Sequence, residues 1–271
     1  MSGPTTTAPQ PPGRVRHPGR RRNEPTLVLC YHALSENWPA PLSVTPHRFE
    51  RQIATLARRG LRGVKFADAA SGAAGRGTVA ITFDDAYRSV LELAAPILAR
   101  FEMPATVFVP TSYPDRAEPM SWPGIDRWVG TEHEHELLPL SWDELGALHE
   151  SGWEIGSHTQ THPRLTTIDD ETLKAELRDS LQACEAAIGV PCRTIAYPYG
   201  DHDERVIKAT REAGYAGAAA LPSPLTAASN PYAYPRIGIY HRDGGGRFAL
   251  KVASLGRRLR IAAGQRATKV S

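Results

Sequence analysis

Apolar positions along the chain fall into two patterns that alternate from residue 27 onward. Short continuous runs rich in β-branched residues, such as Thr78–Phe83 and Ala105–Val109, predict buried strands. Further short runs that we interpret in the same way occupy residues 27–32, 153–156, 194–197 and 215–220. The sequence therefore predicts at least six strands spread over most of its length.

The segments between these runs show helical spacing and helix-capping signals. Ser141 and Glu144 have the spacing of a capping box, and Pro46 lies in the first turn of an apolar stripe at helical spacing. Helices are predicted between residues 45 and 60, 87 and 101, 141 and 152, 169 and 189, and 203 and 213, with a kink at Pro96. This alternation of strands and helices predicts an α/β fold whose parallel sheet closes into a (β/α) barrel.

Charged and imidazole side chains directly follow two of the predicted strands. Asp84 and Asp85 come at the end of the run Thr78–Phe83, and His158 and His162 follow the run 153–156. Parallel α/β folds build their sites from loops at the carboxyl ends of the strands. We therefore expect these four side chains to meet at one rim of the barrel.

This set of side chains has the composition of a catalytic metal site. One carboxylate and two imidazoles can hold a divalent metal and leave a coordination position open, as catalytic zinc sites do. A second carboxylate beside them, Asp84, is placed to take a proton from water that the metal activates. A lone Asp-Asp pair is usually a turn or solvated surface. The positions of both motifs after strands favour hydrolytic chemistry.

Three motifs in this order resemble those of the polysaccharide deacetylase family, which is also called the NodB-homology group or carbohydrate esterase family four. They are the Asp-Asp pair, the His-x-x-x-His pair and the later Tyr197-Pro198-Tyr199-Gly200 stretch, and the likeness runs from about Leu27 to Arg236. The resemblance implies a distorted (β/α) barrel of parallel strands. It also implies metal-dependent removal of acetyl groups, mostly N-acetyl groups of amino sugars.

The resemblance also implies a role for each residue that matches a motif. Asp84 resembles the general base, and Asp85, His158 and His162 resemble the ligands of a divalent metal, usually zinc. The stretch from Tyr197 to Gly200 resembles a loop that walls the substrate groove and offers a backbone donor to the oxyanion. The residues that we expect to contact substrate are Tyr197, Pro198, Tyr199, Gly200 and Arg236.

The sequence departs from the family pattern in two places. Many members have an arginine that orients the catalytic base in the third motif, where this chain has Ala196, and Arg236 is a candidate to supply that charge from another strand. A late Leu-x-His motif, which supplies the general acid, is also missing. His32, at the end of the first predicted strand, is our candidate for the acid. The alternative is that loop hydrogen bonds satisfy His32.

Charge is distributed unevenly along the 271 residues. Residues 1–22 and 244–271 together carry twelve Arg and Lys and no acid, and against a formal net charge of +3 this leaves −9 on residues 23–243. An acidic body argues against nucleic acid as a partner. We expect a disordered basic arm at 1–24, a catalytic domain at 25–263 and a flexible tail at 264–271.

Membrane and export signals are weak. No apolar run is long enough for a transmembrane helix, and the first residues lack the apolar core of a signal peptide, so we expect a cytoplasmic protein. A basic amphipathic helix near the C-terminus, with Phe248 and Val252 on its apolar stripe, allows weak contact with a membrane surface. Docking of this stripe onto the barrel is the interpretation that we prefer.

Three functions remain open alongside N-deacetylation of acetylated carbohydrates. The same site would suit an O-acetyl esterase or a hydrolase of non-sugar amides such as cyclic imides. The missing motif arginine and late histidine leave room for a glycan-binding protein without turnover. The presence of all four residues Asp84, Asp85, His158 and His162 argues for an enzyme.

Overall fold

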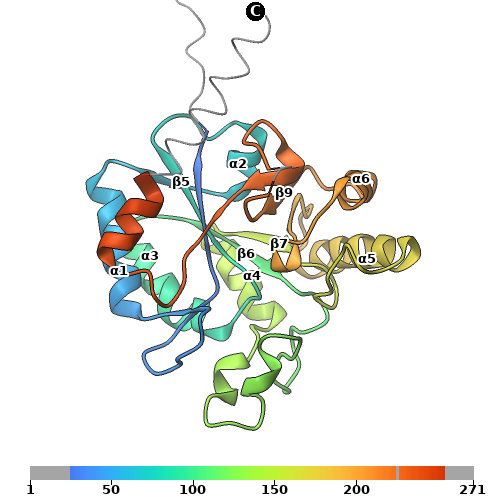
Figure 1. The fold of residues 1–271 in the computed structure, drawn as a ribbon, viewed down its shortest axis with the longest axis horizontal. Coiled ribbons are helices and arrows are strands. Elements are labelled where there is room, and N and C mark those ends of the chain that lie inside the picture. Colours follow the sequence, from blue (N-terminus) through green and yellow to red (C-terminus); the bar gives the residue numbers. More distant parts are fainter. Residues whose placement is uncertain (1–24, 224–225, 254–271) are drawn as a thin grey trace, which may run out of the picture.

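The computed structural model describes residues 25–223 and 226–253, and its centre is a curved parallel sheet of nine strands (Figure 1). Along the sheet the strand order is β10-β9-β8-β7-β6-β5-β1-β11, and β4 pairs with β5. All of these pairs are parallel. The strands are β1 Leu27–Tyr31, β4 Arg62–Val64, β5 Thr78–Phe83, β6 Ala105–Val109, β7 Glu154–Ser157, β8 Thr194–Ala196, β9 Gly217–Ala220, β10 Tyr234–Pro235 and β11 Ile237–Gly238. A separate parallel pair is formed by β2 Ala33–Leu34 and β3 Ser43–Val44.

Helices cover the outside of this sheet. Figure 1 shows α1 and α3 on one side of the barrel and α5 and α6 on the other. The helices are α1 Pro46–Arg58, α2 Phe66–Ser71, α3 Ala95–Arg100, α4 Trp142–Glu150, α5 Asp170–Ile188 and α6 Glu204–Glu212, with short turns η1 Val90–Ala94, η2 Asp126–Trp128, η3 Glu134–Leu137, η4 Pro198–Gly200 and η5 Pro231–Ala233. The capping box of Ser141 and Glu144 is present at the start of α4, as the sequence predicts.

The helix predicted over residues 87–101 is not a regular α-helix. Its first part, η1, is a π-helical turn, and α3 begins only at Ala95, with Pro96 in its first turn. Proline has no N–H and its ring clashes with the carbonyl four residues earlier, so a wider turn before Pro96 avoids both problems. The predicted kink therefore takes the form of a π-helical stretch.

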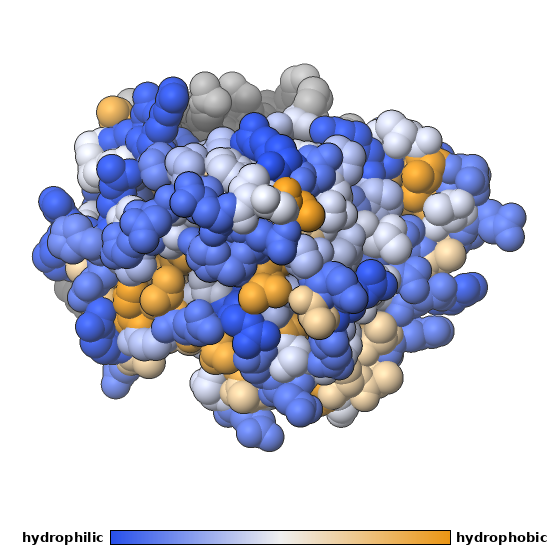
Figure 2. Space-filling model, turned by 90° about the horizontal axis from the view of Figure 1, so that it is seen from below, coloured by the Kyte–Doolittle hydropathy of each residue, from blue (hydrophilic) through white to orange (hydrophobic). Residues whose placement is uncertain are grey.

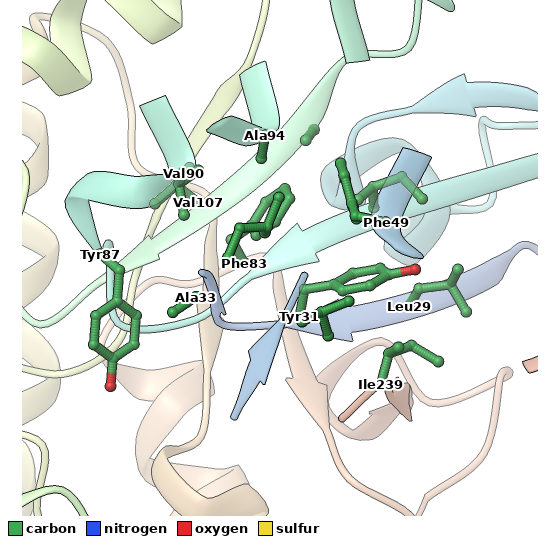
Figure 3. Packing of buried hydrophobic residues seen from close by; sticks show 14 of the residues in the cluster. Leu29, Tyr31, Ala33, Phe49, Phe83, Tyr87, Val90, Ala94, Val107 and Ile239 are labelled. Carbon is green, nitrogen blue, oxygen red and sulfur yellow. The ribbon is translucent and has the colours of Figure 1, made fainter. Parts of the chain in front are cut away.

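The two faces of the sheet are packed differently. The outer face carries large apolar side chains, and Figure 3 shows Tyr31 and Phe83 next to Phe49 of α1, with Val107 beside Val90. Phe83 also stacks on Trp153, with ring centroids 5.8 Å apart. The inner cluster of the barrel is smaller, and its buried members are Val28, Phe66, Ala69, Ala80, Phe108, Ala196, Ala219 and Tyr234.

Because side chains alternate along a strand, every second residue points into the barrel, and this pattern continues to the site residues after the strand ends. Asp84 has the same parity as Ala80 and Thr82 on β5, and His158 has the same parity as Gly156 on β7, so both side chains turn toward the barrel axis. Phe108 fills the space below. A Cβ placed on Gly156 would lie 2.8 Å from the Phe108 ring, and this close approach requires glycine.

The sheet closes through a single residue. Its two edge strands, β10 and β11, are consecutive in the chain and are separated only by Arg236. The chain leaves one edge after Pro235 and joins the opposite edge, beside β1, at Ile237. The seam of the nearly closed barrel thus places Arg236 between its two edges.

The predicted α/β barrel of parallel strands is confirmed. Residues 245–253 are helical, and Phe248 and Val252 are buried against the main core, as the preferred docking interpretation requires. The predicted arm at 1–24 and the tail at 264–271 lie outside the described residues, and so do Leu255 and Leu259, the last two positions of the predicted stripe. Within 25–223 and 226–253, no helix combines the length and apolar character needed to cross a bilayer.

Candidate active site

Asp84 and Arg236 form a buried bidentate ion pair at the end of β5. Arg236 Nη1 donates to Asp84 Oδ1 over 2.6 Å, and Nη2 donates to Oδ2 over 2.8 Å. Nη1 also donates to the Thr82 hydroxyl over 3.1 Å. Both side chains of the pair are almost inaccessible to solvent. Two parallel hydrogen bonds fix the position of the carboxylate as well as compensating its charge.

Electrostatics keep Asp84 ionised. Burial alone would raise the pKa of its carboxyl, but the Arg236 charge, with contributions from His158 and His32, outweighs burial and lowers the pKa to about 2. A carboxylate in this setting is ionised at any physiological pH. The Cys30 thiol lies beside it and donates to Asp84 Oδ2 over 3.4 Å.

Asp85, His158 and His162 converge next to this pair. Asp85 Oδ1 lies 3.4 Å from His158 Nε2 and 3.3 Å from His162 Nε2. One ligand atom from each residue lies within 4.8 Å of the other two, and all three residues are buried. Asp85 Oδ1 and His162 Nδ1 are buried atoms without a hydrogen-bond partner in the described chain. An acidic oxygen and two imidazole nitrogens in this arrangement fit a divalent cation.

The two histidines are held by different means. His158 Nδ1 is 2.8 Å from the Ala196 carbonyl oxygen, and since a carbonyl only accepts, Nδ1 carries the proton and Nε2 is free to bind a metal. His162 Nδ1 has no such bond to any residue that the structure describes. Its ring stacks on Trp122, with centroids 4.1 Å apart and planes 21° apart, and the Tyr199 ring meets it edge-on at 4.7 Å.

Strained backbone conformations cluster at the site. Asp85, Thr159, His162 and Tyr199 all have positive φ angles between 59° and 71°. L-residues other than glycine visit this region rarely, and such positions concentrate where function constrains the backbone.

Burial and neighbouring charged groups shift the pKa values of His162, His158 and Asp85 in opposing directions. Burial lowers the pKa of His162, and Asp85 counteracts this effect only in part. For His158, burial also lowers the pKa, but Asp84 and Asp85 outweigh it and the pKa is raised. Burial would raise the pKa of Asp85, yet the close approach of the His158 and His162 rings holds that pKa well below its usual range.

His32 lies at the same rim. It lines the cavity above the site, and one of its ring nitrogens lies within 4.8 Å of ligand atoms of Cys30 and Asp84. His32 Nδ1 is buried and makes no hydrogen bond with the described residues, which argues against the alternative that loop contacts satisfy it. Burial lowers the pKa of His32, although Asp85 and Asp84 pull it upward.

A cavity of about 450 Å³ opens above these groups. It is lined by His32, Pro41, Leu42, Asp84, Asp85, Trp122, Pro123, Gly124, Ile125, Arg127, His158, His162, Arg164, Tyr199, Gly200, Leu221 and Tyr240. In Figure 1, β1 runs toward the edge where the green segment between β6 and α4 lies, and Figure 2 views the molecule from that side. This face is mostly hydrophilic, with small hydrophobic patches near its middle.

Three of the predicted substrate contacts are not made from the cavity wall. Tyr197 is buried on the outer face of β8, and its hydroxyl donates to the Tyr232 carbonyl over 2.9 Å. Strand alternation explains this, because Ala196 takes the inward position. Pro198 is also buried and outside the lining, whereas Tyr199 and Gly200 line the cavity. Arg236 faces Asp84 rather than the cavity.

Sequence reasoning missed several residues of the cavity. Arg127 belongs to the long connection between β6 and α4, while Arg164 and Leu221 follow β7 and β9. Nothing in the local sequence pattern marks Arg127 or Leu221. The position of Arg164 after His162 was the one available signal, because it shares the same strand-end loop.

Comparisons with known proteins point in one direction. The family model described as polysaccharide deacetylase matches residues 71–218, more than half of the chain. A poly-β-1,6-N-acetyl-D-glucosamine N-deacetylase of Staphylococcus aureus is 29% identical over 170 residues, which are 59% of this chain and 53% of that protein. The chain therefore spans about half the length of this curated relative.

Solved structures show the same fold. The deacetylase PplD of Streptococcus pyogenes, solved in complex with acetate, superimposes with a TM-score of 0.68 at 20% identity and covers 84% of this chain and 97% of its own. IcaB from Ammonifex degensii gives a TM-score of 0.64 at 22% identity, with 85% and 97% covered. With the family model matching the segment that carries Asp84, Asp85, His158 and His162, the chain belongs to the polysaccharide deacetylase family.

Proposed function

We propose that this protein is a metal-dependent hydrolase that removes N-acetyl groups from amino sugars of a glycan or glycoside. The observation that carries the proposal is the buried Asp84–Arg236 pair directly beside the cluster of Asp85, His158 and His162. A fixed proton acceptor lies next to a three-residue cation site, and both face one open cavity. Hydrolysis by activated water requires these groups side by side.

Asp85, His158 and His162 are the residues that would hold the metal. A divalent cation there, with zinc as the metal suited to this ligand set, would polarise the acetyl carbonyl and lower the pKa of a water molecule. The tautomer fixed by Ala196 leaves His158 Nε2 free for this role.

Asp84 accepts the proton of the attacking water in this proposal. Its carboxylate must be ionised beforehand and must face the cavity, and the pairing with Arg236 secures both conditions. Arg236 acts through Asp84 and does not contact substrate. It takes the place of the motif arginine that the sequence lacks at Ala196, because the barrel seam brings it to the same carboxylate.

His32 supplies the proton that the departing amine needs. An amide nitrogen is a poor leaving group until it is protonated, and His32 is the histidine of the cavity wall that lies outside the ligand cluster. Burial lowers the pKa of His32, whereas the carboxylates of Asp85 and Asp84 act to raise it, so these carboxylates favour the protonated form that the step needs. Trp122 and Tyr199 form the walls against which a sugar ring can pack.

The name of the staphylococcal relative supports an amino-sugar substrate. The alternatives share this geometry, because an O-acetyl ester or a non-sugar amide presents the same carbonyl to the same groups. A substrate panel separates them. Zinc-loaded protein would be incubated with N-acetylglucosamine oligomers, acetylated xylose oligomers and a cyclic imide, with and without chelator, and acetate or ring-opened product would be measured.

Chelator-sensitive acetate release from the N-acetylglucosamine oligomers, restored by zinc, is the expected result. Release only from acetylated xylose, or ring opening of the imide alone, would replace the proposed substrate class. Zinc binding without turnover of any substrate would support a glycan-binding role instead.

A further inference from the structure

A second cavity lies beside the active-site cavity. It has a volume of about 830 Å³ and is lined by Pro39, Pro41, Tyr240, His241, Arg242, Asp243, Arg247 and Lys251. Pro41 and Tyr240 line both cavities and so form a shared wall. A chain molecule whose acetylated unit reaches Asp84 can therefore place a neighbouring unit in the second cavity.

Every carboxylate that lines the two cavities is already engaged. Asp84 is paired with Arg236, and Asp85 belongs to the histidine cluster. Asp243 is buried, accepts from the Tyr240 N–H over 2.8 Å and pairs with Lys251 Nζ at 2.6 Å. No lining acid is left to neutralise the remaining cations of these walls.

Four arginines at the two cavities have no carboxylate partner among the residues that the structure describes. Arg127 and Arg164 line the active-site cavity, and Arg242 and Arg247 line the second one. All four are exposed. Arg164 lies over the Tyr199 ring, 4.2 Å from its centroid, and Arg127 lies over the Trp128 ring at 5.2 Å. Stacking of this kind holds a guanidinium in place and leaves its N–H groups for a ligand.

The four arginines without a carboxylate partner in the described chain contrast with the net negative charge of residues 23–243. Residues 23–243 carry −9 formally, so a random sample of their surface would be acidic. Clefts lined by one sign of charge attract ligands of the opposite sign and speed their association. Guanidinium groups recognise carboxylates and phosphates through two parallel hydrogen bonds.

We propose that the substrate is an acetylated glycan that also carries anionic groups, and that the second cavity binds a carboxylate or phosphate next to the sugar being deacetylated. This inference rests on the proposed N-deacetylase function and specifies its substrate class. Arg242 and Arg247 contact the anionic group directly, and Arg127 and Arg164 favour its approach along the active-site cavity.

The test uses the 271-residue, zinc-loaded protein and compares its turnover of three oligomer substrates of equal length. One is a neutral N-acetylglucosamine oligomer, one carries carboxylates on alternate sugars and one carries phosphates. We expect kcat/KM to be higher for at least one charged oligomer, and the advantage to shrink between low and high salt because the arginines are exposed. The charged form that is preferred then identifies the anionic group.

Matched variants connect this preference to the cavity. Arg242→Gln and Arg247→Gln should each lower the charged-to-neutral ratio of kcat/KM by about two- to fivefold. The control is Arg193→Gln, which removes an exposed arginine just before β8, at the opposite end of the barrel. Arg193→Gln should leave the ratio unchanged.

Two results would overturn the inference. A ratio at or below one for both charged oligomers, with normal turnover of the neutral one, would contradict it while leaving the N-deacetylase proposal intact. If no oligomer is deacetylated, the proposed function fails. Calorimetric binding of the charged oligomers then decides the inference separately, and binding no tighter than that of the neutral oligomer, or unaffected by Arg242→Gln, would overturn it.

Discussion

The floor of the candidate site and its rim are built by different forces. The floor consists of Asp84, Arg236 and His158, which sit at strand ends or at the barrel seam and are fixed by hydrogen bonds of 2.6–2.8 Å. The rim consists of His162, Tyr199 and Trp122. His162 and Tyr199 themselves have positive φ angles, and contacts with the Trp122 and Tyr199 rings hold the His162 ring in place. Hydrogen bonds are directional and ring stacking is less so, and the floor should therefore tolerate substitution less well than the rim.

Loss of a proposed metal ligand on the floor should have the largest effect. His158→Ala removes one of the three proposed ligands and leaves Asp85 Oδ1 with a single imidazole nearby. We expect zinc affinity to fall by more than about 100-fold and turnover to fall with it, as it should when a chelator strips the wild type. Zinc competition titration and acetate release measure both. Normal activity of zinc-free protein would exclude metal-dependent chemistry.

Substitution of Arg236 should separate charge from geometry. Arg236→Lys keeps the charge but loses the paired hydrogen bonds to Asp84, and we expect kcat to fall at least about tenfold with little change in KM. Arg236→Met leaves a buried carboxylate without its partner and should destabilise the fold by about 3–5 kcal/mol.

The control for this series is the double variant Asp84→Asn with Arg236→Met. It removes both charges, so thermal unfolding should recover toward the wild-type temperature while turnover stays lost. If Arg236→Lys matched the wild-type kcat, the paired hydrogen bonds would not matter for positioning Asp84.

Substitution on the rim should have a smaller effect. Trp122→Ala removes the ring that stacks on His162, and we expect zinc affinity to fall about tenfold, whereas Trp122→Phe keeps a stacking partner and should stay near wild type. The same zinc competition titration measures both variants. Equal affinities for Trp122→Ala and wild type would show that the His162 ring needs no support from the rim.

The smallest expected effect is the acid dependence of stability in zinc-free protein. The pKa of Asp84 is lowered to about 2 in the folded state, below its value in an unfolded chain. The ion pair with Arg236 therefore contributes stability that is complete above about pH 4 and is lost as the pH falls toward about 2. Urea unfolding across this range should show a shallower slope for Asp84→Asn. Identical slopes would contradict the lowered pKa.

The contrast between floor and rim also explains which parts of the site could be predicted from the sequence. Strand ends are predictable because an apolar run, its length and the next polar residue are local features, and Asp84, Asp85, His158 and His162 were found in this way. The structure places all four together, with His158 Nε2 4.0 Å from Asp84 Oδ2. The ligand and base roles assigned to them remain proposals.

Non-local features could not be predicted from the pattern. Arg236 was a candidate partner of the base only because the family resemblance called for an arginine. Its pairing with Asp84 depends on the two sheet edges meeting at one residue, which no local pattern encodes. Tyr197 was expected to contact substrate, but the parity of β8 decides which of two neighbours faces inward, and that parity became visible only in the sheet. Arg127 comes from an irregular segment whose path depends on tertiary packing.

The most direct test of the account compares zinc-loaded wild type and Asp84→Asn in acetate release from an N-acetylglucosamine oligomer, with zinc content measured on the same samples. Asparagine fits the space of Asp84 but cannot accept the proton of water. The account predicts that the variant keeps its zinc and loses turnover by about 10³-fold. A variant that keeps both zinc and turnover would contradict the assignment of Asp84 as the proton acceptor.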